Sequence, residues 1–394
     1  MMQQSSVRSA QSERLRRIGA YLFADLDRKK EALQARGVDV ISLAIGDPDL
    51  PTPAHIIAAL EKGARDPRTH QYPPYPGTIE FRKAAATWFA NRFGVMLDPQ
   101  RQVLALIGSK EGLAHLPWAT LNPGEVALIP DPGYPVYRSA TIMAEGEPVP
   151  MPLTAEGRFL PDFEQIPKDL ARRARLLFLN YPNNPTGATA DLEFLARAVA
   201  FARRYGLLLV HDNSYSEIAY DGYRPPSVLE VDGAIDVAIE LHSLSKSYNM
   251  TGWRIGFAVG NPEAIEALGT VKTNVDSGVF VAVQQAGIAA LLGPQGVIAS
   301  TVATYRSRRD RLVEVLRGVG WQPPAPKATL YIWMPTPNGG SSVAFAAEVL
   351  ERTGVVITPG VGYGSCGEGY VRLSLTIPDD RLDEALARIR RAYG

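Results

Sequence analysis

The chain has 394 residues, of which 46% are hydrophobic and 21% are charged, and its 41 basic residues balance its 41 acidic ones. This length predicts two domains, and the balanced charge argues against nucleic acid or an anionic membrane as a partner. Cys366 is the only cysteine, which excludes an internal disulfide and a thiolate metal cluster and fits a reducing cytoplasm.

The N-terminus begins polar and turns charged, without the apolar core and cleavage site of a secretion signal. No run of 18 or more apolar residues occurs, so no membrane span is expected. The five histidines are scattered without the spacing of metal ligands. We therefore expect a soluble cytoplasmic protein without a metal site.

A charged amphipathic helix is predicted over residues 20–36, and short apolar strands then alternate with helices. The expected strands are 40–46, 102–108, 126–130, 175–180, 207–212, 238–243 and 255–260, and the expected helices are 54–64, 78–93, 110–121, 190–204 and 262–271. This alternation predicts an α/β fold in which helices cover both faces of a mostly parallel, seven-stranded sheet.

The pattern changes after about residue 285. Longer helices are expected at 296–318, 342–353 and 380–392, and strands at 330–334, 355–358 and 370–375. This order predicts a smaller α+β domain. We expect a large domain over 46–285, a small one over 286–394, and an N-terminal segment, 1–45, that packs with the small domain.

Ligands of open α/β sheets bind at the carboxyl ends of the strands. Polar or glycine-containing segments follow several expected strands, namely Gly46–Pro48, Gly108–Lys110, Asp131–Tyr134, Asn180–Gly187, Asp212–Tyr215 and Ser243–Lys246. The sequence therefore predicts one composite site at this edge of the large sheet.

Taken in order, the motifs LAIGDPD, YPPYPG, GSKEG, PDPGYPVY, NYPNNPTG, VHDNSY, SLSKSYNMTGWRIG and YVRLSL resemble those of the class I/II aminotransferases of the aspartate aminotransferase fold type. The resemblance covers nearly the whole chain. It implies a large pyridoxal 5'-phosphate-binding domain, amino-acid and 2-oxo-acid substrates used in a ping-pong reaction, and a homodimer with shared active sites.

The resemblance assigns the contacts with the cofactor's ring to five residues. Lys246 would carry the cofactor as a Schiff base and move the substrate proton. Asp212 would keep the pyridine nitrogen protonated, Tyr215 and Asn184 would bond the phenolic oxygen, and Tyr134 would stack on the ring.

The phosphate needs hydrogen-bond donors. Ser109 and Lys110 open an expected helix whose N-terminus favours an anion, and Ser243 and Arg254 add a hydroxyl and a guanidinium group. Tyr72 resembles the tyrosine that reaches the phosphate of the partner subunit. Ser277 would also lie at that interface.

Substrate recognition is expected from Arg372, which would hold the α-carboxylate through two parallel hydrogen bonds. Asn184 and the backbone of Gly46 would complete this end of the site, and Tyr21 would lie near the substrate's distal end. No arginine occurs in 271–280 to bind a distal carboxylate, and Lys272 and Lys110 are the nearest cations.

The segments YLFADLDRKKEAL, SYNMTGWRIG and VKTNVDSG look most like bacterial enzymes assigned as LL-diaminopimelate aminotransferases, which use 2-oxoglutarate. Aspartate or alanine aminotransferase activity and a pyridoxal phosphate C–S lyase are the alternatives.

Two other classes of enzyme fit the sequence less well. Ser243-x-x-Lys246 lacks the companion motifs of a penicillin-binding enzyme, and no helix pattern follows Gly360–Gly364, which favours a flexible loop over a dinucleotide site.

Overall fold

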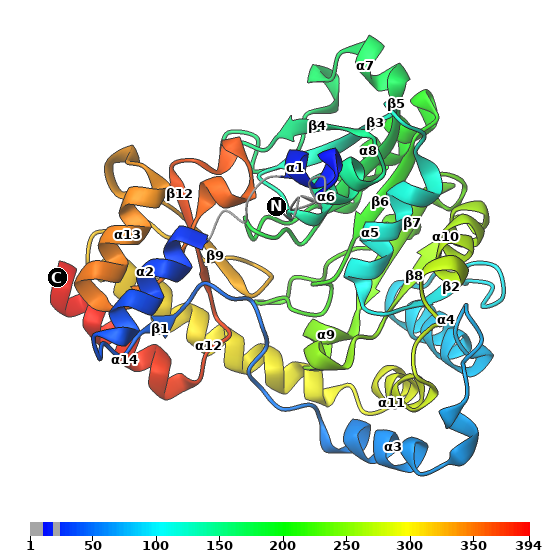
Figure 1. Cartoon of the computed structure of the whole chain (residues 1–394), viewed down its shortest axis with the longest axis horizontal. Helices are drawn as coiled ribbons and strands as arrows, with labels where there is room; N and C mark the ends of the chain where they lie inside the picture. The colour runs from blue at the N-terminus through cyan, green and yellow to red at the C-terminus, as the bar shows by residue number, and fades with distance from the viewer. Residues whose placement is uncertain (1–10, 19–23) are drawn as a thin grey trace, which may run out of the picture.

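The structure, a computed structural model, describes residues 11–18 and 24–394. Its centre is a seven-stranded sheet in the order β2-β8-β7-β6-β5-β3-β4 (Figure 1). The strands are β2 (Val103–Leu106), β3 (Val126–Asp131), β4 (Glu147–Pro152), β5 (Ala174–Asn180), β6 (Leu208–Asp212), β7 (Ala238–Ser243) and β8 (Gly256–Gly260). Only β8 runs antiparallel to its neighbours. The predicted mostly parallel α/β sheet is confirmed.

Helices cover both faces of this sheet. One face packs against α3 (Ala54–Ala64), α4 (Ile79–Phe93), α8 (Leu192–Tyr205) and α11 (Val281–Leu292), and the other against α5 (Ser109–Thr120), α6 (Val136–Met143) and α10 (Pro262–Val275). Successive residues of a strand point to opposite faces, so Leu209 joins the first hydrophobic cluster and Val210 the second. Strands buried on both sides explain the continuous apolar runs in the sequence.

Capping residues explain why several helix bounds could be predicted closely. Helix α4 begins after Thr78, whose hydroxyl accepts from the Phe81 N–H, and it ends at Gly94 with a positive φ. Helix α8 has the same arrangement between Asp191 and Gly206. A polar side chain at the N-cap and a left-handed glycine at the C-terminus are strong local stop signals.

A second, smaller region lies beside the sheet, at the left of Figure 1. It contains the antiparallel strands β11 (Thr358–Pro359), β12 (Tyr370–Ser374) and β9 (Tyr331–Pro335), the parallel pair β1 (Ile41–Ser42) and β10 (Val355–Val356), and the helices α2 (Ala24–Ala35), α12 (Gly296–Gly318), α13 (Ser342–Thr353) and α14 (Asp379–Tyr393). A separate hydrophobic cluster fills it, and Ile41 and Leu43 of the N-terminal segment belong to that cluster.

Short elements connect these parts. They are the helices α1 (Glu13–Ile18), α7 (Lys168–Arg173) and α9 (Leu244–Ser247), and the 3₁₀ turns η1 (Pro67–His70), η2 (Phe163–Gln165), η3 (Val228–Glu230), η4 (Ala234–Asp236), η5 (Thr251–Trp253), η6 (Pro337–Gly339), η7 (Gly360–Tyr363) and η8 (Ser365–Gly367).

Two strand assignments differ from the prediction. Of residues 40–46 only Ile41–Ser42 forms a strand, and it pairs with β10 outside the large sheet. The seventh strand of that sheet is β4, EPVPMP, which was not predicted. Its three prolines cannot donate to a ladder, and β4 is an edge strand that pairs only with β3.

The boundary predicted between residues 285 and 286 falls inside α11. This helix packs on α3 and α4 of the large region, and the chain leaves it only at Gly293. Apart from Gln284 and Gln285, helix α11 is made of small or apolar residues on all sides, so its sequence shows no amphipathic period that would have marked it.

Within the described residues, no single helix is long and apolar enough to cross a membrane. Helices α11 and α12 together reach the required length and hydropathy, but they bend by 81° where they meet.

Candidate active site

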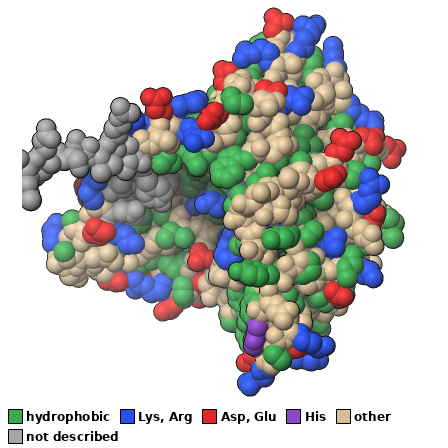
Figure 2. Space-filling model, turned by 45° about the vertical axis from the view of Figure 1, so that its right-hand side comes forward, with side chains coloured by type: hydrophobic (Ala, Val, Ile, Leu, Met, Phe, Trp, Pro, Cys, Tyr) green, Lys and Arg blue, Asp and Glu red, His purple; other side chains and the backbone are tan. Residues whose placement is uncertain are grey.

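A cavity of about 1180 Å³ lies between the carboxyl edge of the large sheet and the smaller region. Figure 2 shows the corresponding hollow, with basic side chains at its wall. The predicted site residues that line it are Gly46, Ser109, Lys110, Tyr134, Asn184, Asp212, Tyr215, Ser243, Lys246, Arg254 and Arg372. The structure thus brings together residues that are far apart in the sequence.

Tyr72 and Ser277 are not among the residues that line the cavity, and a third predicted residue is not described. Tyr21 lies outside the described residues. Tyr72 is 87% exposed on the surface of the single chain, and Ser277 is exposed as well.

Asp212 ends β6 and is buried. One carboxylate oxygen accepts hydrogen bonds from the hydroxyl and the N–H of Ser214, at 2.6 and 3.2 Å, and the other accepts from the Tyr137 hydroxyl at 2.8 Å. Burial raises the pKa of Asp212, whereas these hydrogen bonds act in the opposite direction. The donors hold the carboxylate in one orientation at the cavity wall.

Lys246 lies in the short helix α9, directly after β7, and is partly buried. Its Nζ donates to the Gly46 carbonyl at 2.7 Å, and it forms no ion pair with a described residue. Burial lowers the pKa of the Lys246 ammonium. A lysine whose proton is weakly held is suited to act as a nucleophile and as a base.

Tyr215 forms a pair with a residue that sequence reasoning missed. Its hydroxyl lies 3.0 Å from that of Tyr331, which is at the start of β9. Burial raises the pKa of Tyr215 well above its ordinary value, so the phenol stays neutral and able to donate. Tyr331 belongs to none of the recognised motifs, and only the fold brings it to the cavity.

Arg372 in β12 is 7% exposed and has no acidic partner among the described residues. Its guanidinium donates to Asn184 Oδ1 at 2.8 Å and to the Ala44 carbonyl at 2.6 Å, and no described residue is a partner of its buried Nε. The rings of Tyr331 and Tyr363 lie 4.0 and 4.8 Å from it. A buried guanidinium held by neutral groups is ready to bind a carboxylate.

The N-terminus of α5 lies at the cavity wall and has the features of an anion-binding site. Gly108 has a φ of +74°, and a Cβ there would lie 2.4 Å from Arg254 Nη2, so only glycine allows this approach. The Ser109 hydroxyl lies 3.1 Å from that of Ser214. Neither Lys110 nor Arg254 forms an ion pair with a described residue. Unneutralised cations at a helix N-terminus suit a phosphate.

These groups fit pyridoxal 5'-phosphate. The cradle of Gly108 and Arg254 offers a place for the phosphate, and Asp212, Tyr215 and Lys246 lie on the same cavity. The hydroxyl of Ser245, which also lines the cavity, is buried without a partner in the described part of the chain. A buried unpaired donor at a cavity wall is a mark of a bound polar group.

Two sequence interpretations require correction. Lys272 cannot serve as a cation for the substrate, because it is fully buried and its Nζ contacts Glu111 at 3.0 Å and Asp276 at 3.1 Å. Glu111 and Asp276 also form, together with His115, a cluster of side chains that could hold a metal ion. The Lys272 ammonium lies against both carboxylates of this cluster. The Gly360–Gly364 segment, expected as a flexible loop, contains the 3₁₀ turn η7, in which Gly360 is buried and a Cβ would clash with backbone oxygens.

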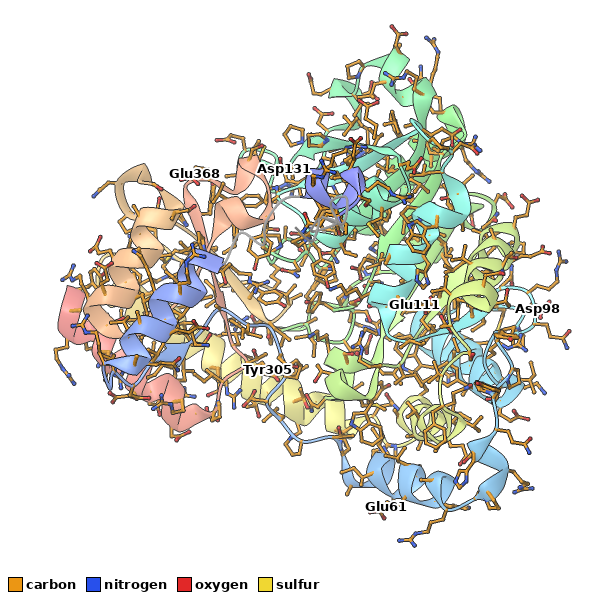
Figure 3. The ribbon with its side chains drawn as sticks, viewed as in Figure 1. Glu61, Asp98, Glu111, Asp131, Tyr305 and Glu368 are labelled. Atoms are coloured by element: carbon orange, nitrogen blue, oxygen red, sulfur yellow. The ribbon has the colours of Figure 1, made fainter. Side chains whose placement is uncertain are left out.

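The two regions also meet at Asp131, at the end of β3 (Figure 3). Its carboxylate accepts from the Ser365 hydroxyl at 2.9 Å and from the Cys366 N–H at 3.0 Å, and the Gly133 N–H donates to the Tyr363 carbonyl at 2.8 Å. These contacts hold the segment that carries Tyr363, and therefore one wall of the Arg372 pocket.

Gly46 is expected to tolerate no side chain. A Cβ at this position would lie 1.9 Å from the Tyr331 hydroxyl oxygen, whereas a Cβ on Gly252, another cavity residue, would meet nothing within 4 Å. We expect Gly46→Ala to destabilise the fold by about 1–3 kcal/mol through overpacking and to weaken amino-acid binding, and Gly252→Ala to do neither. Urea unfolding and substrate KM measure both. Equal behaviour of the two variants would contradict this reading.

The family described as aminotransferase class I and II matches residues 38–389. The chain is 58% identical to an LL-diaminopimelate aminotransferase of Desulforudis audaxviator over 98% of both chains. Among solved structures, that of BacF from Bacillus subtilis with bound substrate is 38% identical, with a TM-score of 0.93 over 98% of both chains. A double mutant of the Thermus thermophilus aspartate aminotransferase is 29% identical, with a TM-score of 0.91 over 98% of this chain and 100% of that one.

Proposed function

The chain belongs to the class I and II aminotransferase family, and from this premise we propose that it transfers an amino group between LL-diaminopimelate and 2-oxoglutarate. An aminotransferase of this family uses pyridoxal 5'-phosphate. The choice of LL-diaminopimelate is supported by the similarity to the Desulforudis enzyme over nearly the whole length of both chains.

In the proposed reaction, Arg372 binds the α-carboxylate and fixes the direction of the Cα–H bond. Lys246 accepts the proton from the α-carbon and would return it to C4′ of bound pyridoxal phosphate. Bound pyridoxal phosphate supplies a ring that withdraws electrons from the substrate α-carbon. Asp212 holds a proton at the ring nitrogen, and Tyr215 and Asn184 donate to the phenolic oxygen.

The observation that carries the substrate proposal is a further cation in the cavity, one that no other proposed role uses. Lys30 of α2 lines it, is half-buried and forms no ion pair with a described residue. Lys110 and Arg254 serve the phosphate end, and Arg372 serves the α-carboxylate. Lys30 therefore remains for the distal carboxylate of a substrate such as LL-diaminopimelate.

The substrate is tested by initial rates with 2-oxoglutarate and LL-diaminopimelate, aspartate or alanine. The proposal expects glutamate to form with the highest kcat/KM from LL-diaminopimelate. A higher value with aspartate or alanine would overturn it in favour of those activities. Pyruvate and ammonia released from a sulfur-containing amino acid, without any oxo acid, would indicate a C–S lyase.

Replacement of Lys30 gives a matched comparison. We expect Lys30→Met to raise KM for LL-diaminopimelate by roughly tenfold, because about 1.4 kcal/mol of charge pairing is lost. The KM for alanine should stay unchanged, since alanine has no distal carboxylate. An equal change for both donors would show that Lys30 acts on the fold and not on the distal group.

We further propose a homodimer with shared active sites, located in the cytoplasm. Several apolar side chains are exposed near Tyr72, among them Tyr75, Val275 and Phe280. The segments that carry them lie together, because a Cβ on Gly278 would contact Pro73 at 3.1 Å. An exposed apolar patch of this kind favours contact with a second subunit.

Mixed dimers test the shared site. Tyr72→Ala and Lys246→Ala chains should each be impaired alone. In a mixed dimer, one site combines the intact Lys246 of one chain with the intact Tyr72 of the other. We expect activity well above the sum of the two parents, measured after co-expression and tandem-tag purification. Activity equal to that sum would place Tyr72 outside the partner's site.

A further inference from the structure

A buried group of titratable residues lies on the sheet face opposite Asp212. It consists of His211 of β6 and Glu240 and His242 of β7, which are 0, 0 and 3% exposed. His211 pairs in register with Glu240 on the neighbouring strand. The roles proposed above use none of these residues, although burying charged groups is costly unless they are paired.

Glu240 is the centre of this group. Its carboxylate accepts hydrogen bonds from His211 Nδ1 at 2.8 Å, His242 Nε2 at 2.7 Å, Asn213 Nδ2 at 3.2 Å, the Ser227 hydroxyl at 2.9 Å and the Val228 N–H at 2.8 Å. Burial alone would raise the pKa of Glu240, but the charge and hydrogen bond of His211 and the hydrogen bond of His242 lower it well below its ordinary value. The carboxylate is therefore ionised.

The partners of His211 determine its charge. Its Nδ1 faces the ionised carboxylate of Glu240, and its Nε2 lies 3.1 Å from the Tyr181 carbonyl oxygen. Both partners only accept hydrogen bonds, so both ring nitrogens must carry a proton. His211 is consequently an imidazolium ion in a buried ion pair.

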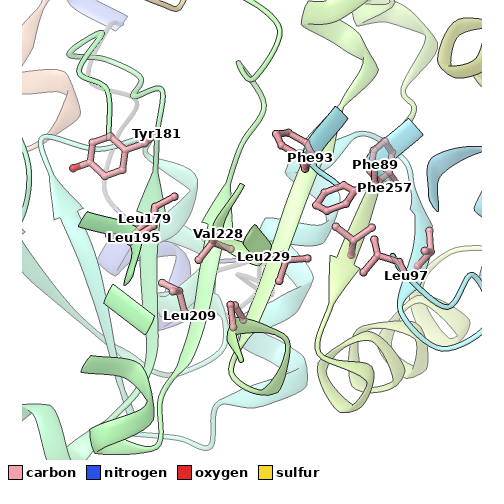
Figure 4. Packing of buried hydrophobic residues seen from close by; sticks show 14 of the residues in the cluster. Phe89, Phe93, Leu97, Leu179, Tyr181, Leu195, Leu209, Val228, Leu229 and Phe257 are labelled. Atoms are coloured by element: carbon pink, nitrogen blue, oxygen red, sulfur yellow. The ribbon is translucent and has the colours of Figure 1, made fainter. Parts of the chain in front are cut away.

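His242 makes its hydrogen bond to Glu240 with a single ring proton, on Nε2. Its Nε2 donates to Glu240, and its ring packs among Trp88, Phe89, Phe93 and Phe257, with centroid distances of 5.0 to 5.9 Å. Figure 4 shows three of these rings, Phe89, Phe93 and Phe257, in the buried core. With one carboxylate and one imidazolium, the group is neutral, and its positive end lies at His211.

His211 is also the residue before Asp212. Asp212 forms no ion pair with a described residue, and its direct partners Tyr137 and Ser214 are neutral. We propose that the fixed positive charge of His211 lowers the proton affinity of Asp212 through the sheet and so leaves the shared proton on the ring nitrogen of bound pyridoxal phosphate. His211 is then a positioning residue for that proton. This rests on the proposed role of Asp212.

The physical reason is the low polarity of the sheet interior, in which a charge acts over several ångströms with little screening. Without the positive charge of His211, burial would give the Asp212 carboxylate a higher proton affinity. The shared proton would then move from the ring nitrogen to the carboxylate. The ring would then withdraw electrons less strongly, although every direct contact of Asp212 would be unchanged.

The test compares two neutral replacements that each keep one hydrogen bond to Glu240. In His211→Asn the amide nitrogen takes the place of Nδ1, and in His242→Gln it takes the place of Nε2. The holoenzymes are prepared with pyridoxal phosphate labelled with ¹⁵N in the ring, and the ¹⁵N chemical shift is recorded against pH. Urea unfolding of the same samples reports any loss of stability.

We expect the wild type and His242→Gln to show a protonated ring nitrogen, and His211→Asn to shift toward the value of neutral pyridine. An unchanged shift in a folded His211→Asn holoenzyme would overturn the proposal, as would an equal change in His242→Gln. If His211→Asn does not fold, His211→Gln, whose amide can reach the Tyr181 carbonyl, takes its place under the same criteria. An unprotonated ring in the wild type would instead remove the proposed role of Asp212. The choice of amino donor, which the initial rates with different donors decide, is independent of either result.

Discussion

Lys246→Ala is expected to lower kcat for amino transfer by about 10²- to 10⁴-fold, because the group that moves the substrate proton is lost. The structure places Nζ in the cavity, where burial lowers the pKa of the ammonium and, within the described residues, only the Gly46 carbonyl accepts its hydrogen bond. Lys272 cannot replace it, since its ammonium is fully engaged with Glu111 and Asp276. Single-turnover measurements with bound cofactor isolate this step from cofactor binding.

Two observations make the Lys246 prediction specific. A small primary amine added to Lys246→Ala should restore part of the rate, since it can enter the vacated space and accept the proton. The same amine should not affect the wild type. The phosphate donors at the N-terminus of α5 are untouched, so the variant should still bind the cofactor. A variant that keeps about a tenth of the wild-type kcat would show that another group moves the proton.

The sequence allowed the large sheet and most of the cavity wall to be predicted because both depend on local signals. Asp212 and Lys246 follow directly on buried strands, and parallel strands bring their carboxyl ends to one edge. Arg372 could be assigned only through the family motif. An arginine in an alternating strand is typical of a solvated face, yet here it is 7% exposed.

The remaining site residues depend on tertiary contacts that leave no local pattern. Tyr331 reaches the cavity because β9 pairs with β12 in another region, and Gly46 leaves the space that its hydroxyl occupies. Tyr137 contacts Asp212 from α6, a short helix that was not predicted. The charge of His211 follows from two hydrogen-bond acceptors, the Glu240 carboxylate and the Tyr181 carbonyl. Both lie far from His211 in the sequence, so no spacing reveals them.

Replacement of Arg372 by lysine tests the binding of the α-carboxylate. Lysine keeps the positive charge but cannot form two parallel hydrogen bonds or stack as a plane between Tyr331 and Tyr363. Losing a buried pair of this kind costs about 2–5 kcal/mol, and each 1.4 kcal/mol corresponds to about tenfold. We therefore expect kcat/KM for amino acids to fall by roughly 30-fold to several thousandfold, measured from initial rates.

The control for Arg372→Lys is a substrate that lacks an α-carboxylate. A simple primary amine without an α-carboxylate reacts slowly with either protein, and its rate should be the same for the wild type and the variant. Cofactor affinity should also be unchanged, because Arg372 contacts Asn184 and the Ala44 carbonyl but no residue of the phosphate end. If the amine loses as much rate as the amino acid, Arg372 supports the cavity through those two contacts, and the carboxylate binds elsewhere. If only the amino acid is affected, the buried guanidinium with its unpaired Nε is the carboxylate site.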